Sequence, residues 1–159
     1  MPDPSATFRG TYREDAWRRC AQMSAGDGIV FNPWPHDDRY PNWSLPALEA
    51  AKCAARQGRE AFDRIHLRLY EAFFAHGRNI SDAAEIVKIA AEAGVDAERF
   101  IADYRAGTGR DDVVEDYKAA AEEGVRSIPT VVLPATGRAL VGLVELAQYR
   151  AAIEEATGS

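Results

Sequence analysis

A helical pattern that changes abruptly to a strand pattern is the feature that most constrains how this chain can fold. From residue 44 to residue 123, apolar side chains recur at three- and four-residue steps, and glycines end most of the helical segments. After Gly124 the pattern becomes apolar and β-branched, beginning at Pro129. This order predicts an α/β chain with a large helical part and a small β part near its C-terminal end.

The bounds of the predicted elements follow from cap residues, glycines and turn residues. Ser81 and Asp96 are the expected N-caps of two helices, and Val113, Val114 and Tyr117 are expected to face inward from a later one. Turn residues at 134–137 separate two apolar runs, which predicts a β-hairpin. The expected helices span residues 12–23, 45–57, 60–76, 81–94, 96–107, 110–123 and 143–156, and the expected strands span residues 29–31, 130–133 and 138–142.

Composition excludes several classes of protein. A length of 159 residues favours one domain, and a net charge of −6 argues against a nucleic-acid partner, which needs a basic face. The longest apolar run, residues 128–135, is far shorter than the roughly 20 residues that cross a bilayer, so no membrane span is predicted. The first residues lack the basic start and apolar stretch of a secretory signal. With only two cysteines, we expect a cytoplasmic protein with reduced thiols.

Aromatic residues gather in the first third of the chain, where Trp17, Trp34 and Trp43 lie near Phe31 and Tyr40. Such residues most often pack a segment onto its neighbours. The functional alternative is an apolar wall that receives a ligand beside the Pro129 loop.

The segment from Gly124 to Leu133 is the most informative motif. A helix ends at a glycine, a short connector reaches Pro129, and an apolar strand begins directly after it. Spacing alone does not decide the isomer of the Ile128–Pro129 bond, because only about 5–6% of such bonds are cis. The segment resembles the Gly-Val-x-x-[Val/Ile]-Pro-Thr loop of thioredoxin-fold proteins, especially the DsbA family and its FrnE-like members.

Other parts of the chain are similar to the same family in the same order. Residues 42–47 resemble the start of the family's helical insertion, 62–79 resemble its long inserted helix, and 94–100 resemble the turn that follows. The resemblance implies an α/β, thioredoxin-like (DsbA-type) fold with a large helical insertion and a C-terminal β-hairpin plus helix. The implied boundaries are an N-terminal extension over 1–27 and a DsbA-like domain over 28–157, with the insertion at 44–123 and the C-terminal thioredoxin half at 124–157.

The resemblance also implies a binding site. In the family the proline is cis and faces an active-site dithiol, so Ser127, Ile128 and Pro129 are the expected substrate-binding residues. Backbone groups at Ile128 would pair with an extended peptide in strand-like fashion, or the loop would hold a small thiol. The resemblance implies no bound cofactor, although glutathione or a similar thiol is a candidate ligand. No metal site is predicted.

The Cys-x-x-Cys motif of the family is missing. Cys20 and Cys53 each fall inside a predicted helix, whereas redox exchange needs two thiols two residues apart at a helix N-terminus. Nothing before Gly28 resembles the family's first strand, redox helix and second strand. We therefore expect an incomplete thioredoxin fold, truncated or without independent redox catalysis, and predict no catalytic residue.

Two other functions remain open on the sequence. One is a glutathione-dependent transferase or isomerase, like the kappa-class and hydroxychromene-carboxylate isomerase relatives of the fold. The other is a non-catalytic interaction module. Because the hairpin at 130–141 would present an unpaired strand edge, we also expect a homodimer.

Overall fold

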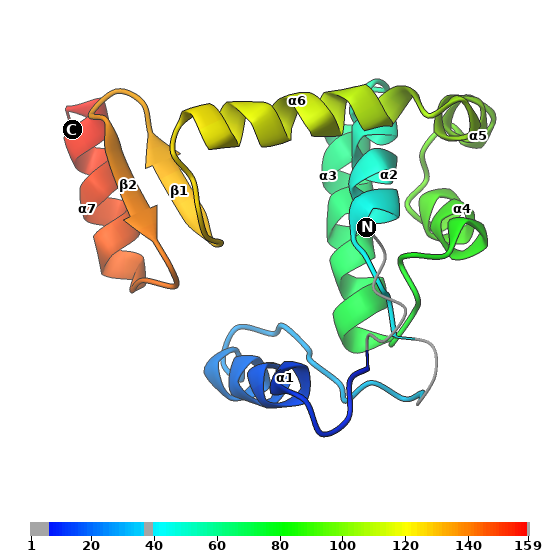
Figure 1. Ribbon diagram of the computed structural model, residues 1–159, viewed down its shortest axis with the longest axis horizontal. Coiled ribbons are helices and arrows are strands. Elements are labelled where there is room, and N and C mark those ends of the chain that lie inside the picture. The colour runs from blue at the N-terminus through cyan, green and yellow to red at the C-terminus, as the bar shows by residue number, and fades with distance from the viewer. Residues whose placement is uncertain (1–6, 37–39, 159) are drawn as a thin grey trace. The chain divides into compact units, whose positions relative to one another are not determined.

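The structure is a computed structural model that describes residues 7–36 and 40–158. The chain forms two compact units, Met1–Val114 and Glu115–Ser159, and α6 passes from the first into the second (Figure 1). No helix formed by the described residues is both long and apolar enough to cross a membrane. The elements are α1 (Tyr12–Met23), α2 (Leu45–Ala55), α3 (Arg59–Tyr70), the π-helical turn η1 (Glu71–Ala75), α4 (Ala83–Glu92), α5 (Ala97–Ala106), α6 (Thr108–Glu122), β1 (Thr130–Leu133), β2 (Arg138–Val141) and α7 (Leu146–Thr157).

The helix starts show which polar side chains act as caps. Asp96 caps α5 as predicted, because its carboxylate accepts a hydrogen bond from Arg99 N–H at 3.0 Å. The prediction of Ser81 as the cap of α4 is wrong. Asp82 caps that helix, and both the N–H and the hydroxyl of Ser81 donate to the side chain of Asn79. The local Asn79–Ser81 turn therefore delays the start of α4 by one residue.

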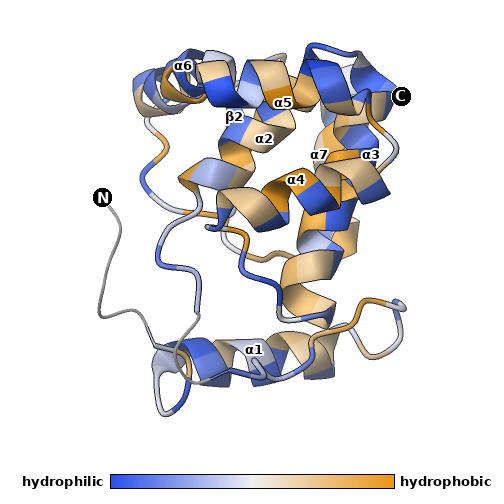
Figure 2. Cartoon of the chain, turned by 90° about the vertical axis from the view of Figure 1, so that its right-hand side faces the viewer, coloured by the Kyte–Doolittle hydropathy of each residue, from blue (hydrophilic) through white to orange (hydrophobic). Residues whose placement is uncertain are grey.

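The core of the first unit is built by α2, α3, α4 and α5. Ile65, Ile86, Ile89 and Phe100 are fully buried there, and small alanines of α2 let the neighbouring helices approach. Figure 2 shows hydrophobic and hydrophilic residues on different parts of the surface of α3 and α4, as expected for helices that bury one face.

Aromatic side chains form a second cluster in the first unit. Trp17 and Trp34 are buried with Phe8, and Phe31, Tyr40, Phe73 and Phe74 pack around them. Trp43 lies outside this cluster. The cluster attaches the N-terminal segment to η1, in keeping with the packing interpretation of these residues.

The predicted strand at 29–31 is wrong. Residues 29–31 have no strand partner among the described residues, and Ile29 and Val30 are exposed. Asn32 instead donates from its backbone N–H to Phe74 C=O at 2.9 Å, which docks this segment on η1 as a loop.

The second unit consists of the end of α6, a β-hairpin and α7. The strands pair antiparallel, with Val131 opposite Leu140 and Val132 opposite Ala139. Leu140 of β2 and Ala152 of α7 are both buried, so α7 covers the face of the hairpin that carries Leu140. The sheet has two strands in the described residues. The final helix begins at Leu146, three residues later than the sequence predicts.

Candidate functional site

The loop of the candidate site begins where α6 is ended by a Schellman motif. Gly124 has a φ of +73°, the left-handed region that suits glycine. Its N–H donates to Ala121 C=O at 3.0 Å, and Val125 N–H donates to Ala120 C=O at 2.9 Å. These hydrogen bonds satisfy the last carbonyls of the helix and turn the chain back, so that the following residues lie against the end of α6.

The loop then leads into the hairpin through Pro129, and the Ile128–Pro129 peptide bond is cis. Thr130 donates its hydroxyl to Ser127 C=O at 2.7 Å, and Gly142 N–H donates to Pro129 C=O at 2.8 Å. The loop is thus fixed at both ends, on one side by the helix stop and on the other by the sheet.

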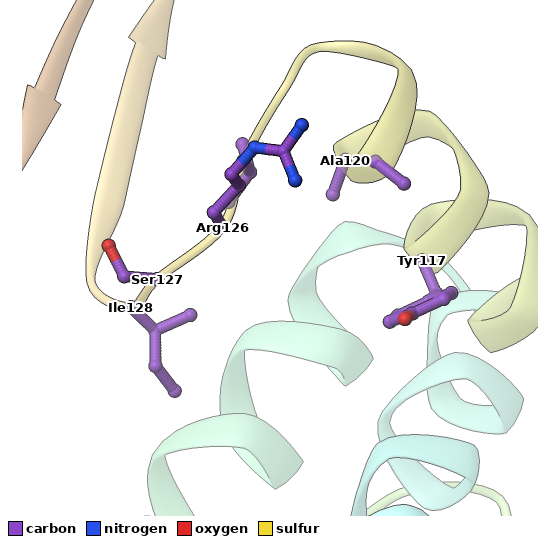
Figure 3. Close-up of a pocket in the computed structure, with 7 residues that line it drawn as sticks. Tyr117, Ala120, Arg126, Ser127 and Ile128 are labelled. Atoms are coloured by element: carbon purple, nitrogen blue, oxygen red, sulfur yellow. The ribbon is translucent and has the colours of Figure 1, made fainter.

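A pocket of about 580 Å³ lies between the loop and the last turns of α6 (Figure 3). From the helix, Tyr117, Ala120 and Ala121 share one face because they are three and four residues apart. Its wall therefore consists mostly of apolar groups, with one cation. The residues that line it are Tyr117, Ala120, Ala121, Val125, Arg126, Ser127 and Ile128.

Of the three site residues expected from the sequence, Ser127 and Ile128 line this pocket, and Pro129 follows them directly. Ile128 is 91% exposed, more than any other large hydrophobic residue that the structure describes. Its backbone N–H and C=O have no hydrogen-bond partner within the described part of the chain. Ile128 therefore presents both an apolar side chain and free backbone groups to a ligand.

The expected inward orientation of Val114 and Tyr117 is wrong. Their side chains are 43% and 76% exposed, and Tyr117 lines the pocket. Val114 is not among the core residues of the first unit, and Tyr117 belongs to the second unit, where α6 has no buried residue. Tyr117, Val125 and Arg126 are site residues that the sequence reasoning missed. The spacing of Tyr117 with Ala120 and Ala121 is a signal that could have indicated a shared face.

Neither thiol belongs to the pocket. Cys20 is exposed on α1, and Cys53 is buried on α2 near the Thr108 hydroxyl, 4.0 Å away. Burial raises the pKa of the Cys53 thiol, only partly opposed by its contacts with Thr108 and Gly109, and so makes it less reactive. Both cysteines are free. Residues 7–36 and 40–158 contain no group of three or more His, Cys, Asp or Glu placed to hold a metal ion.

Among the residues that the structure describes, the most strongly buried charge lies in the first unit. Glu49 of α2 is 6% exposed and accepts a hydrogen bond from Arg110 Nε of α6. Burial, together with the nearby Glu49 carboxylate, raises the pKa of Tyr104 to about 12. Because Arg110 compensates the carboxylate, this group of residues ties α6 to α2.

Comparison with known proteins agrees with this geometry. Residues 21–154 match the family model described as DSBA-like thioredoxin domain. The chain is also similar to the ClpXP adapter protein SpxH of Bacillus subtilis (strain 168), with 30% identity over 117 residues. That match covers 74% of this chain and 39% of the relative's length. A helical region, a cis-proline loop and a hairpin followed by a helix are arranged here within one matched stretch, and the chain belongs to the DSBA-like thioredoxin domain family.

Proposed function

We propose that this chain is a peptide-binding member of its thiol–disulfide oxidoreductase-like family and does not catalyse thiol–disulfide exchange by itself. The observation that carries the proposal is Ile128, whose exposed side chain and unpaired backbone groups lie beside an apolar pocket. An extended peptide would pair with this backbone as an added strand and place an apolar side chain against Tyr117.

The sequence supports the second half of the proposal. It contains two cysteines and no Cys-x-x-Cys, and neither thiol lines the pocket. A redox reaction at the loop would need a thiolate and a resolving thiol, which the described residues do not bring there. A cytoplasmic location, where both thiols stay reduced, is part of this proposal.

An adapter role is a second candidate. The similar SpxH is named as a ClpXP adapter protein. A pocket that binds an extended peptide is compatible with such a role. The glutathione-dependent alternative predicts instead that the loop holds free glutathione, and isothermal titration with glutathione distinguishes it from peptide binding.

The proposal predicts a large effect of a charge at Ile128. We expect Ile128→Glu to weaken binding of a fluorescein-labelled, amidated peptide Ser-Leu-Gln-Leu-Ser by about 10-fold or more, since burying an aliphatic side chain contributes about 1.5–3 kcal/mol. Fluorescence anisotropy measures the affinity. Ile153→Glu is the matched control, because Ile153 is also exposed in the second unit but lies on α7, outside the pocket. Equal affinities of the two variants would contradict the proposal.

A further inference from the structure

The pocket carries one cation, Arg126, on a wall that is apolar apart from Ser127 and the hydroxyl of Tyr117. Arg126 extends from the loop toward α6 near Ala120, while Ile128 lies farther along the loop and Tyr117 projects from α6 (Figure 3). The guanidinium and the apolar groups therefore border the same space. A ligand that fills this space meets a positive charge beside a hydrophobic surface.

Arg126 is exposed and has no ion pair or hydrogen bond within the described residues. Other arginines of the chain are engaged by carboxylates: Arg56 by Asp112, Arg78 by Glu85 and Glu92. The chain has 25 acidic and 19 basic residues, so an unpaired guanidinium at the pocket is not part of a general basic surface. Its planar donors fit a carboxylate, to which they can donate two hydrogen bonds.

We propose that the pocket selects extended peptides in which a carboxylate lies two residues from an apolar side chain, because such side chains share one face of a strand. The apolar side chain lies against Tyr117 and Ile128, the peptide backbone pairs with Ile128, and the carboxylate binds Arg126. The carboxylate is supplied by an Asp or Glu side chain or by the peptide's C-terminus. This inference rests on the proposed peptide-binding function and assigns its substrate class.

The test compares peptides that differ in one charge. The 159-residue chain is titrated at low salt into fluorescein-labelled Ser-Leu-Ser-Xaa-Ser, with Xaa as Glu, Gln or Lys and an amidated C-terminus. A fourth peptide has Gln and a free C-terminal carboxylate, which separates the side-chain source from the terminal one. We expect the Glu peptide to bind about 5-fold more tightly than the Lys peptide, the size expected when an exposed ion pair replaces a like-charge contact. Raising the salt concentration should reduce this ratio.

Two charge-reversal variants show which arginine is responsible. Arg126→Glu should invert the preference, so that the Lys peptide binds more tightly than the Glu peptide. Arg150→Glu makes the same change in charge on α7, outside the pocket, and should leave the preference as in the original protein. If the original protein and Arg126→Glu bind all the peptides equally, peptide binding stands and the role of Arg126 is overturned. If no peptide binds, both the proposed function and this inference are overturned.

Discussion

Replacing Phe100 by alanine is expected to lower the free energy of unfolding by about 3–5 kcal/mol, the cost typical of truncating a buried phenylalanine. The Phe100 side chain is fully buried among the apolar residues of α2, α3 and α4, and its ring stacks on Tyr104 with the centroids 5.6 Å apart. Because domains of this size are stable by about 5–15 kcal/mol, the variant would be close to unfolding. Urea denaturation followed by far-ultraviolet circular dichroism measures the change.

Leu67→Ala is the control for this prediction. Leu67 lies on α3 but is 68% exposed, so its truncation should change the free energy of unfolding by no more than about 0.5 kcal/mol. If the two alanine variants were equally stable, the helical core described for the first unit would be incorrect.

The free edge of β1 gives the second large expected effect. Pro129 and Gly142 form a hydrogen-bonded pair, so alternation along the antiparallel ladder directs the backbone groups of Val131 and Leu133 toward β2. The groups of Thr130 and Val132 then point to the other side, where the described residues provide no strand. The edge is uncharged, and two copies can pair antiparallel about Val131, with Thr130 of each opposite Val132 of the other.

We therefore expect a homodimer at micromolar concentration, in which two β1 strands pair across a two-fold axis. Val132→Pro removes an N–H that such a dimer needs and that the hairpin does not use, so this variant should sediment as a monomer. Ala139→Pro is the matched control. Ala139 is directly opposite Val132, and its N–H points to the outer side of β2, so this variant should remain a dimer. Sedimentation equilibrium decides, and a monomeric original protein would contradict the strand-edge dimer.

Much of the fold could be predicted because its signals are local. The hairpin strand at Thr130–Leu133 and the helix starting after Asp96 depend on residues that are adjacent in the sequence. The start of α4 could not be predicted because its two candidate N-caps, Ser81 and Asp82, are neighbours in the sequence. Ser81 is hydrogen-bonded to the side chain of Asn79, so Asp82 caps the helix. The apolar run at Ile29–Phe31 was misassigned because it has the composition of a strand, whereas packing on η1 makes it a loop.

The candidate site was only half predictable. Ser127 and Ile128 follow from the motif around Pro129, which is continuous in the sequence. Tyr117 could not be placed, since its helical periodicity suggests a core position, whereas it belongs to the second unit and is exposed there. Arg126 had no signal in the sequence. Its importance arises from the Schellman turn, which brings the loop back against the helix.

The central claim, that a member of this family binds peptides without redox catalysis of its own, is tested most directly by a disulfide-reduction assay. The substrate is a self-quenched peptide whose fluorescence rises when dithiothreitol cleaves its disulfide. We expect the protein to leave the rate of cleavage at that of buffer, and the double variant Cys20→Ser and Cys53→Ser to behave identically. A substantial acceleration by the original protein that disappears in the double variant would contradict the claim, because it would show that the two free thiols support catalysis.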